Sequence, residues 1–446
     1  MELCAPPSQQ IVFFITYLTT QLASMRLSPK VSFQLILLLL VIGGLILTQF
    51  LLSRGHYEEQ SARNCEETNP MPFWSRGFAR SCCDIFPTVF GRHSGGFFEA
   101  GVASDSTYFF ERGIRSGDIV YVVTSDFPKF VEKFHRLEGT TRITLVTGSE
   151  DIGAPWEIFH PDRIDFFDYK MSSLWPTGQL MTMREFLGDK RLVRWYTQNY
   201  DMVGNNSFTS SDIDVVADKS IIEKVFPLPI GLDFHTLAEK KRGISSDSIA
   251  NSLCKQRRDI ASILSTSLPF SERKLSVYAK FDCLFSAIKS RHIRIMTRGT
   301  ICKLLESYDQ NSTSNHGNRL IFSPPTRGKG RKMSLRDAKL SFWSNVSQVR
   351  FALAPPGFGI DTHRVWEILN LHTIPIVMSS PLDRLYAMFP AIIVKDWSEV
   401  FEEGSLPRFQ SQILARFGEN PFSKTVDEML RSDYWINKIR NGSREV

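Results

Sequence analysis

Apolar and polar residues follow one another in blocks along most of this chain, and the blocks have the lengths of buried strands and amphipathic helices. Residues 119–124 form an apolar, β-branched run, which is typical of a strand buried on both faces. Residues 127–137 place large apolar side chains at helical spacing, and residues 143–147 form the next apolar run. Strand, helix and strand in this order predict a parallel α/β sheet.

The same rhythm occurs twice. Apolar runs at 192–197 and 225–230 extend the first series, whereas residues 236–273 turn polar and serine-rich, which indicates an interdomain connection with a helix or two. The strands expected in the second series are residues 274–279, 293–296, 319–322, 351–354, 373–378 and 391–394. The sequence therefore predicts two α/β domains, over residues 84–235 and 274–430, with a C-terminal tail over residues 431–446.

The N-terminal part follows a different pattern. Residues 31–52 are uncharged and almost wholly apolar, and as a helix of about 33 Å they match a bilayer core of roughly 30 Å. Arg26 and Lys30 precede the run, and Arg54 follows it together with Glu58 and Glu59, which favours a cytosolic N-terminus. The predicted segments are a cytosolic tail (1–30), a single transmembrane anchor (31–52) and a stem (53–83), with the remainder in the lumen.

Cysteine usage agrees with a lumenal location. Cys4 falls on the cytosolic side, and the other six cysteines allow up to three disulfides in an oxidising compartment. The adjacent Cys82 and Cys83 are expected to reach different partners. Ordinary buried thiols are the alternative, and the absence of Cys-x-x-Cys spacing argues against zinc. The six are Cys65, Cys82, Cys83, Cys254, Cys283 and Cys302.

One segment of the chain carries a concentrated positive charge. The net charge is only +6, but residues 326–339 concentrate six basic residues beside glycines. Such a cluster usually indicates nucleic acid, which a lumenal domain does not meet. Two interpretations remain, a solvated loop or a basic loop over donor phosphates or an acidic acceptor glycan.

The most informative stretch of the sequence is residues 351–377. An apolar strand ends in a turn containing Gly357 and Gly359, Asp361 or Thr362 can cap a helix that follows, and a second buried strand returns. A glycine turn that leads into a helix N-terminus leaves backbone N–H groups free for an anion such as a diphosphate.

Side chains of this helix sharpen the prediction. Arg364 in the first turn can form a forked contact with phosphate oxygens, and Glu367 one turn later can accept hydrogen bonds from ribose hydroxyls. An exposed i, i+3 ion pair between the two is the alternative. His363 is either a further donor to the ligand or a structural residue beside the cap.

At these residues the chain resembles exostosin-like glycosyltransferases and the related ribitol xylosyltransferase, whose C-terminal signature reads "aPpG…R.wEal..G.iPvi". The resemblance covers residues 343–397. It implies a GT-B fold, in which two Rossmann-like domains face a cleft, and transfer from a UDP-sugar, with Arg364 near the donor diphosphate and Glu367 near the ribose. His372 stands where the family usually has glycine or another small residue.

Sugar transfer also needs a base for the acceptor hydroxyl. Glu150 and Asp151 are the first choices, because they follow a long buried strand through a Gly-Ser turn, although strand-end acids are often helix caps. The candidates at strand ends are Asp126, Glu150, Asp151, Asp233 and His235.

Other chemistries have weaker support. Asp212 and Asp214 have the form of a manganese-binding Asp-x-Asp motif, but no apolar strand leads into them, so loop or cap carboxylates are favoured. Gly357 and Gly359 lack the third glycine of a dinucleotide fingerprint. The expectation is therefore no metal and no cofactor beyond the nucleotide-sugar donor.

Together these features predict a Golgi type II membrane glycosyltransferase of α/β GT-B fold that transfers a sugar from a UDP donor to a glycan. Inversion and the UDP preference come from the resemblance alone. A fucosyltransferase-like enzyme that uses a GDP-sugar, and a non-catalytic lumenal protein that binds nucleotide or glycan, are the open alternatives.

Overall fold

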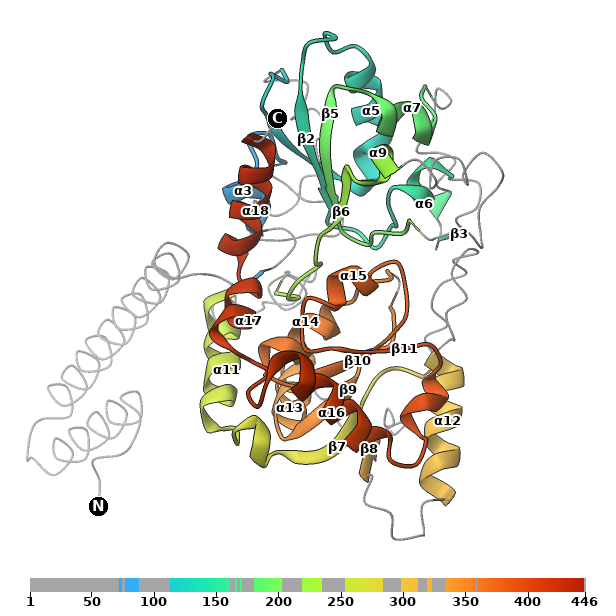
Figure 1. Cartoon of the computed structure of the whole chain (residues 1–446), viewed down its shortest axis with the longest axis vertical. Helices are drawn as coiled ribbons and strands as arrows, with labels where there is room; N and C mark the ends of the chain where they lie inside the picture. The colour runs from blue at the N-terminus through green and yellow to red at the C-terminus, as the bar shows by residue number, and fades with distance from the viewer. Residues whose placement is uncertain are drawn as a thin grey trace, which may run out of the picture. The chain divides into compact units, whose positions relative to one another are not determined.

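The structure is a computed structural model, and Figure 1 shows the whole chain. It describes residues 72–73, 77–87, 113–160, 165–166, 169–170, 180–202, 219–234, 253–283, 298–311, 319–322, 334–357 and 359–444. The chain separates into the units Met1–Asn69 and Pro70–Val446, and all described residues belong to the second. The predicted anchor over residues 31–52 lies outside them. No helix among the described residues is long and apolar enough to cross a membrane.

The first predicted α/β series forms a parallel four-stranded sheet in the order β1-β2-β5-β6. Every residue of β1 and β2 is buried, which explains their uninterrupted apolar runs. The first strand ends one residue earlier than predicted, because Thr124 already belongs to a 3-10 turn. The strands are β1 (Ile119–Val123), β2 (Ile143–Gly148), β5 (Leu192–Thr197) and β6 (Val225–Pro227).

Aromatic packing holds the helices of this sheet. Helix α5 begins at Phe127, with Pro128 in its first turn, and buries Phe130 and Phe134 on one face. Phe127 stacks on Trp195 of β5 with ring centroids 5.1 Å apart, and each buried ring contributes roughly 1.5–3 kcal/mol. The remaining elements of this part are α5 (Phe127–His135), α6 (Trp156–Phe159), α7 (Met183–Gly188), α9 (Lys219–Ile222) and the short pair β3 (Asp165–Phe166) and β4 (Tyr169–Lys170).

The second series forms a parallel five-stranded sheet in the order β11-β10-β9-β7-β8. Chain order reverses at β7, which has β8 on one side and β9 on the other. Ligands of open parallel sheets bind beyond the carboxyl ends of the strands at such a reversal. The strands are β7 (Lys274–Ala279), β8 (Arg319–Phe322), β9 (Val349–Leu353), β10 (Ile374–Met378) and β11 (Ile392–Val394). The predicted strand at 293–296 lies outside the described residues.

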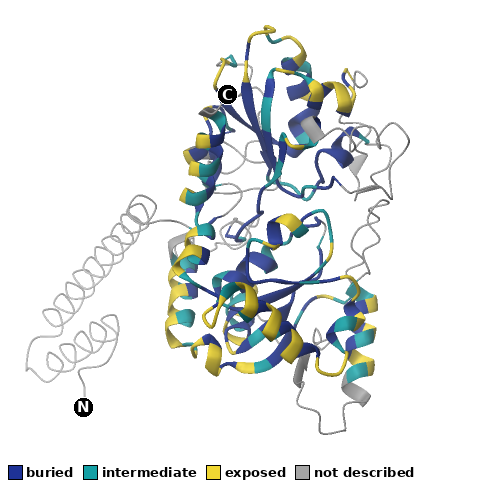
Figure 2. Cartoon of the chain, in the orientation of Figure 1, coloured by how far each residue is buried: buried dark blue, intermediate teal, exposed yellow. Residues whose placement is uncertain are grey.

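Helices cover the second sheet, and Figure 2 shows most of strands β9 and β10 buried. The predicted interdomain connection contains one of these helices, α11. Residues 335–339 of the basic segment begin α13, so this part of it is not a loop. The helices are α11 (Leu253–Thr266), α12 (Arg298–Asn311), α13 (Leu335–Val346), α14 (His363–Asn370), α15 (Asp383–Tyr386), α16 (Ser405–Phe417) and α17 (Lys424–Met429), with 3-10 turns η4 (Phe270–Glu272) and η5 (Trp397–Val400).

Two boundary predictions are corrected. Residues 432–444 of the predicted tail form helix α18 (Ser432–Arg444), which packs against β5 and α3 (Gly77–Cys82) (Figure 1). Trp435 and, from the end of the predicted stem, Phe78 are both buried. Each segment is short or largely polar in sequence, and its few apolar residues gain burial only when α3 and α18 pack together.

The cysteine prediction holds in part. Cys283 and Cys302 form a disulfide. Cys82 and Cys83 do not reach disulfide partners as expected, since both are free thiols buried in the core. Burial raises the pKa of the Cys83 thiol well above its ordinary value, which keeps the group neutral. Cys4 and Cys65 lie outside the described residues.

Candidate functional site

The glycine turn and helix of residues 351–377 form as predicted at the carboxyl end of β9. Helix α14 begins at His363, and Thr362 occupies the N-cap position with an extended backbone. Its hydroxyl makes no capping hydrogen bond, and Oγ1 is buried without a partner among the described residues. The turn therefore presents an unused hydroxyl beside the helix N-terminus, where anions are stabilised.

Arg364 adds an unused cationic donor at the same place. Its Nη1 is enclosed and has no hydrogen-bond partner within the described part of the chain. The guanidinium lies over the rings of Phe342, 5.2 Å from the centroid, and Phe281, at 5.8 Å. Burial lowers its pKa, which the charge of Glu367 partly opposes. A buried charged donor without a partner carries a large desolvation penalty, which a bound anion would remove.

Arg298 is a second cation at this turn, and sequence reasoning missed it. It begins α12, and its Nε donates to the carbonyl of Pro356 over 2.9 Å. A Cβ on Gly357 would lie 3.4 Å from its Nη2. Burial, and then the charge of Arg364, lower the pKa of Arg298 to about 10. Its only signal in the sequence is its place just after the strand expected at 293–296.

Glu367 is buried rather than forming an exposed ion pair with Arg364, so that alternative is wrong. Glu367 is 7% exposed, and its Oε1 lies 3.1 Å from Nζ of Lys339. The same ammonium lies 3.3 Å from Oδ2 of Asp233, which follows β6. Lys339, the last residue of the basic segment, therefore links the predicted ribose-binding carboxylate to a strand-end acid of the first sheet.

The two first-choice bases have different surroundings. Oε2 of Glu150 accepts the backbone N–H of Ser125 at 2.6 Å, and Oε1 accepts the Ser125 hydroxyl at 2.8 Å. Burial raises the pKa of Glu150 to about 7, although the Ser125 hydrogen bonds oppose the rise. Both carboxylate oxygens thus fix the turn between β1 and α5, which is the cap-like role that the sequence left open.

Asp151 lies within electrostatic range of His363, the first residue of α14. Burial raises its pKa, the nearby His363 lowers it, and Asp233 raises it. His363 donates from Nδ1 to the carbonyl of Gly231 over 2.7 Å. Asp151 and Asp233 therefore share the surroundings of the α14 N-terminus. Asp126 instead pairs with Lys129 at the start of α5, and His235 lies outside the described residues.

Close hydrogen bonds join the two sheet edges beside this site. Asn199, which follows β5, donates from Nδ2 to the carbonyl of Glu150 at 3.0 Å and accepts the N–H of Asp361 at 2.9 Å. A Cβ on Gly359 would lie 2.4 Å from Oδ1 of Asn199. The second glycine of the turn is therefore required for contact with the first sheet, whereas Gly357 faces Arg298.

Asp361 completes this junction. It is 1% exposed and accepts hydrogen bonds from the Ile230 N–H at 2.8 Å, the Trp366 indole at 2.9 Å and the Tyr386 hydroxyl at 2.9 Å. Burial raises its pKa to about 6. The carboxylate of Asp361 is used by these three hydrogen bonds. Of the two predicted caps of α14, Thr362 therefore occupies the N-cap position.

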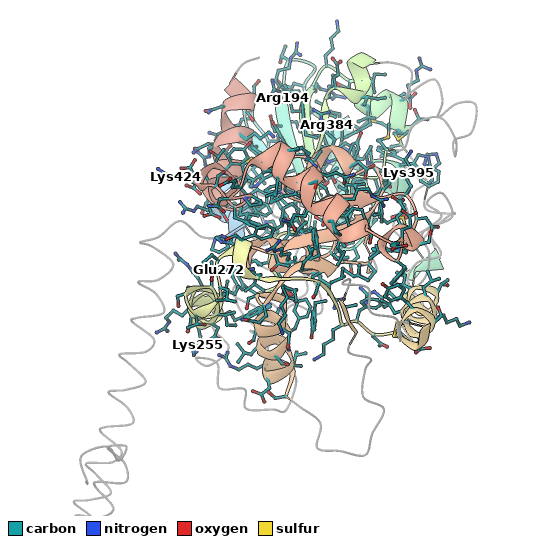
Figure 3. The ribbon with its side chains drawn as sticks, turned by 60° about the horizontal axis from the view of Figure 1, so that its bottom comes forward. Arg194, Lys255, Glu272, Arg384, Lys395 and Lys424 are labelled. Carbon is teal, nitrogen blue, oxygen red and sulfur yellow. A yellow bond between two sulfur atoms is a disulfide. The ribbon has the colours of Figure 1, made fainter. Side chains whose placement is uncertain are left out.

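A small pocket adjoins the turn at the carboxyl ends of β9 and β10. It is lined by Ala354, Pro356, Ile360, Val377, Met378, Ser379, Ser380 and Tyr386. Other charged residues lie elsewhere: Figure 3 shows Lys255 and Lys424 at the periphery of the ribbon, and the side chain of Lys424 is 90% exposed. Enclosed cations thus distinguish the turn from the ordinary surface. No group of three metal-ligating side chains occurs among the described residues, and Asp212 and Asp214 lie outside them.

No protein-family profile matches the chain, and no curated protein sequence matches it. Solved structures with some similarity include "trehalose-6-phosphate from E. coli bound with UDP-2-fluoro glucose", at 10% identity and a TM-score of 0.32 over 76% of each chain. Another is an alpha,alpha-trehalose-phosphate synthase (UDP-forming) from Burkholderia vietnamiensis, also at 10% identity and a TM-score of 0.32, over 75% of this chain and 77% of that chain. These values are too low to carry a fold or a function to this chain.

Proposed function

We propose that this chain is a GT-B glycosyltransferase that transfers a sugar from a UDP-sugar to a glycan, with inversion and without a metal. The observation that carries the proposal is the enclosed, unpartnered Nη1 of Arg364 beside Arg298 at the N-terminus of α14. Two guanidiniums close enough for the charge of Arg364 to lower the pKa of Arg298 favour a ligand with at least two negative charges. A diphosphate has that charge and fits a helix N-terminus.

The leaving group is stabilised in this proposal by groups already in place. As the bond between the anomeric carbon and the diphosphate oxygen breaks, its electron pair moves to the nucleoside diphosphate. Arg364, Arg298 and the N–H groups of the first turn of α14 neutralise that charge without reorganisation. This is why the reaction needs no metal.

Asp151 is assigned as the base. It takes the proton of the acceptor hydroxyl while the hydroxyl oxygen attacks the anomeric carbon from the side opposite the diphosphate. A pKa raised by burial makes the carboxylate a stronger base than a solvated aspartate. Glu150 is not assigned this role, since Ser125 occupies both of its oxygens.

Glu367 is assigned to the ribose. Lys339 holds Oε1, which fixes the carboxylate and leaves Oε2 for a ribose hydroxyl. A carboxylate held in this way distinguishes a nucleotide from free diphosphate, because it accepts hydrogen bonds that only the sugar supplies.

A Golgi location with the catalytic part in the lumen is part of the proposal. It rests on the apolar run at residues 31–52, and the Cys283–Cys302 disulfide supports an oxidising compartment. The resemblance of residues 343–397 to exostosin-like enzymes supports the UDP donor and the inversion.

The test is a thermal-shift titration of the detergent-solubilised full chain with UDP, GDP and CMP and their sugar conjugates, with and without manganese. We expect UDP to stabilise the protein, by about 2.7 kcal/mol at 100 times its dissociation constant, independently of manganese. Arg364→Gln and Glu367→Gln should remove the shift. Arg136→Gln, which changes an arginine that is 69% exposed, should retain it.

Each other outcome decides between the alternatives. A shift with GDP alone would replace the UDP assignment by a fucosyltransferase-like donor. A shift that requires manganese would overturn the metal-independent mechanism. No shift with any nucleotide would overturn the enzyme assignment in favour of a non-catalytic protein.

A further inference from the structure

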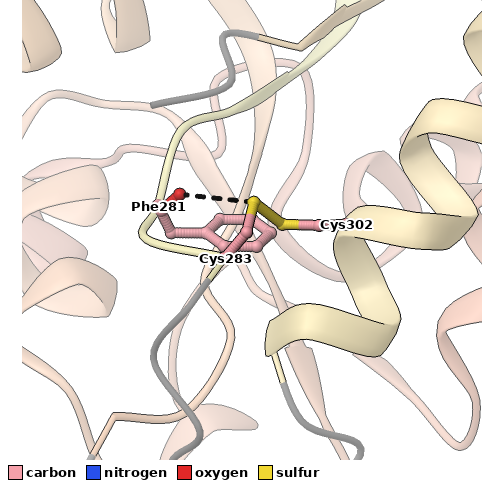
Figure 4. The surroundings of a disulfide bond; sticks show 3 residues. All are labelled: Phe281, Cys283 and Cys302. Atoms are coloured by element: carbon pink, nitrogen blue, oxygen red, sulfur yellow. Dashed lines mark hydrogen bonds between the residues drawn. A yellow bond between two sulfur atoms is a disulfide. The ribbon is translucent and has the colours of Figure 1, made fainter. Parts of the chain in front are cut away.

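Helix α12 carries two of the features described above on one face. Arg298 is its first residue, and Cys302 follows four residues later, which places the two side chains over the same stripe of the helix. Cys302 is bonded to Cys283, with the two Cα atoms 5.9 Å apart (Figure 4). The turn of α12 that supplies a donor-site cation is therefore covalently fixed.

The other end of the disulfide also belongs to the site. Cys283 lies just beyond the carboxyl end of β7, and its sulfur is 3.9 Å from the carbonyl oxygen of Phe281 (Figure 4). The Phe281 ring is 3% exposed and lies under the Arg364 guanidinium. The crosslink thus joins the segment that supports Arg364 to the helix turn that carries Arg298.

A mechanical need for this crosslink follows from the charges. Arg364 lowers the pKa of Arg298, which means that the two cations repel each other while no anion lies between them. The charge of Asp282, the neighbour of Cys283, opposes this effect, and Nε of Arg298 donates to the carbonyl of Pro356 over 2.9 Å. Residues in the first turn of a helix also lack intrahelical partners for their N–H groups. The crosslink ties this turn to the segment that carries Phe281 and Asp282, so its loss would let the turn shift relative to Arg364.

We infer that the Cys283–Cys302 disulfide is a positioning element of the anion site, and that affinity for a nucleoside diphosphate depends on its being oxidised. This inference rests on the proposed function. A dithiol such as dithiothreitol would reduce it: two electrons and two protons pass to the sulfurs, two thiols form, and the dithiol becomes a cyclic disulfide. The buried thiols of Cys82 and Cys83 take no part.

The test compares UDP binding to the full chain by calorimetry in four forms: wild type, Cys283→Ser/Cys302→Ser, Arg298→Gln, and the triple variant. We expect about tenfold weaker binding in the first two variants, the loss of one charge-assisted contact. The triple variant should bind no more weakly than either, because the disulfide acts through Arg298. Independent losses that multiply in the triple variant would overturn the inference.

Three further measurements separate positioning from a general effect on folding. Uridine, which lacks the diphosphate, should bind the wild type and the double variant equally; equal losses for uridine and UDP would overturn the inference. Reduction of folded wild-type protein should reproduce the double variant, so the test does not depend on that variant folding. Glu306→Ser, an exposed position on the same helix, should bind UDP normally.

The outcomes also separate this inference from the function on which it rests. Oxidised wild-type protein that does not bind UDP would contradict the proposed function. Oxidised and reduced proteins that bind UDP equally well would leave that function intact and overturn the role of the disulfide alone.

Discussion

Two turns, one at the carboxyl edge of each sheet, differ in how fully their polar side chains are hydrogen-bonded. On the first sheet, both oxygens of Glu150 are used by Ser125, in hydrogen bonds that fix a turn. On the second sheet, Thr362 Oγ1 and Arg364 Nη1 are enclosed and lack partners within the described part of the chain. Satisfied polar groups at a strand end indicate structure, whereas an enclosed cationic donor and hydroxyl without partners at a helix N-terminus favour a bound anion, because binding would remove their desolvation cost.

Asp151 is the exception on the first edge, since its surroundings include His363 and Asp233 rather than a capped turn. The comparison therefore distinguishes two neighbouring carboxylates that the sequence ranked together. The two edges are in direct contact where Asn199 packs against Gly359 and accepts the N–H of Asp361.

We expect the largest effect on activity from a substitution of Asp151. Asp151→Asn removes the proposed base and should lower kcat by about 10²–10⁴, because general-base catalysis contributes about that much. Donor KM should change little, since the diphosphate contacts remain. Initial-rate kinetics with the donor identified by the titration would measure both constants.

Glu150→Gln is the matched control for that experiment, as it makes the same chemical change at the neighbouring residue. It should retain turnover within about tenfold, the size expected for a positioning effect. A collapse of kcat in Glu150→Gln together with normal turnover in Asp151→Asn would exchange the two roles.

The second effect concerns stability and pH. Burial raises the pKa of Glu150 from 4.5 to about 7 in the folded protein, so folding takes up a proton between these values. The associated stability is fully present below pH 4.5 and is lost as the pH rises through 7. The loss should reach up to about 3 kcal/mol at pH 8, which chemical unfolding at several pH values would measure.

The glutamine of Glu150→Gln cannot titrate, so the variant should lack this contribution to the dependence of the unfolding free energy on pH. The difference in unfolding free energy between wild type and variant should therefore change between pH 4.5 and pH 7. A difference that stays constant from pH 5 to pH 8 would show that Glu150 keeps its ordinary pKa. Asp361, whose pKa is raised to about 6, contributes a slope of the same sign to both proteins.

The smallest effect tests the junction between the edges. Gly359→Ala places a methyl group 2.4 Å from Asn199 Oδ1 and should destabilise the fold by about 2 kcal/mol through overpacking. Gly139→Ala, where nothing lies within 4 Å of the new Cβ, should be close to neutral. Thermal unfolding of the two variants measures the contrast, and equal melting temperatures would show that the junction is not tightly packed.

The resemblance in the sequence contained a clue that the structure explains. His372 stands where exostosin-like proteins usually have glycine, and its φ is +53°, in the left-handed region. It ends α14 by donating its N–H to Leu369 over 2.9 Å, a position that favours glycine. The imidazole stacks on Phe422 and lies 3.0 Å from Asp427, contacts that offset the strained backbone.

The sequence by itself determined the two parallel sheets, most strand bounds and the turn before α14, because buried strands require uninterrupted apolar runs and an anion turn requires glycine and a helix start. These are properties of neighbours along the chain. It did not show that residues 432–444 form a helix on the first sheet, since their apolar positions gain burial only after the helix packs on β5 and α3.

Only the tertiary structure decided which polar residues come together at the candidate site. Arg298 joins Arg364, Lys339 holds Glu367, and Ser125 occupies Glu150, each through a contact between segments far apart in sequence. Whether a charged side chain caps a turn or remains available to a ligand depends on the donors and acceptors that folding brings within about 3 Å of it. That information lies in the packing and not in the spacing of residues along the chain.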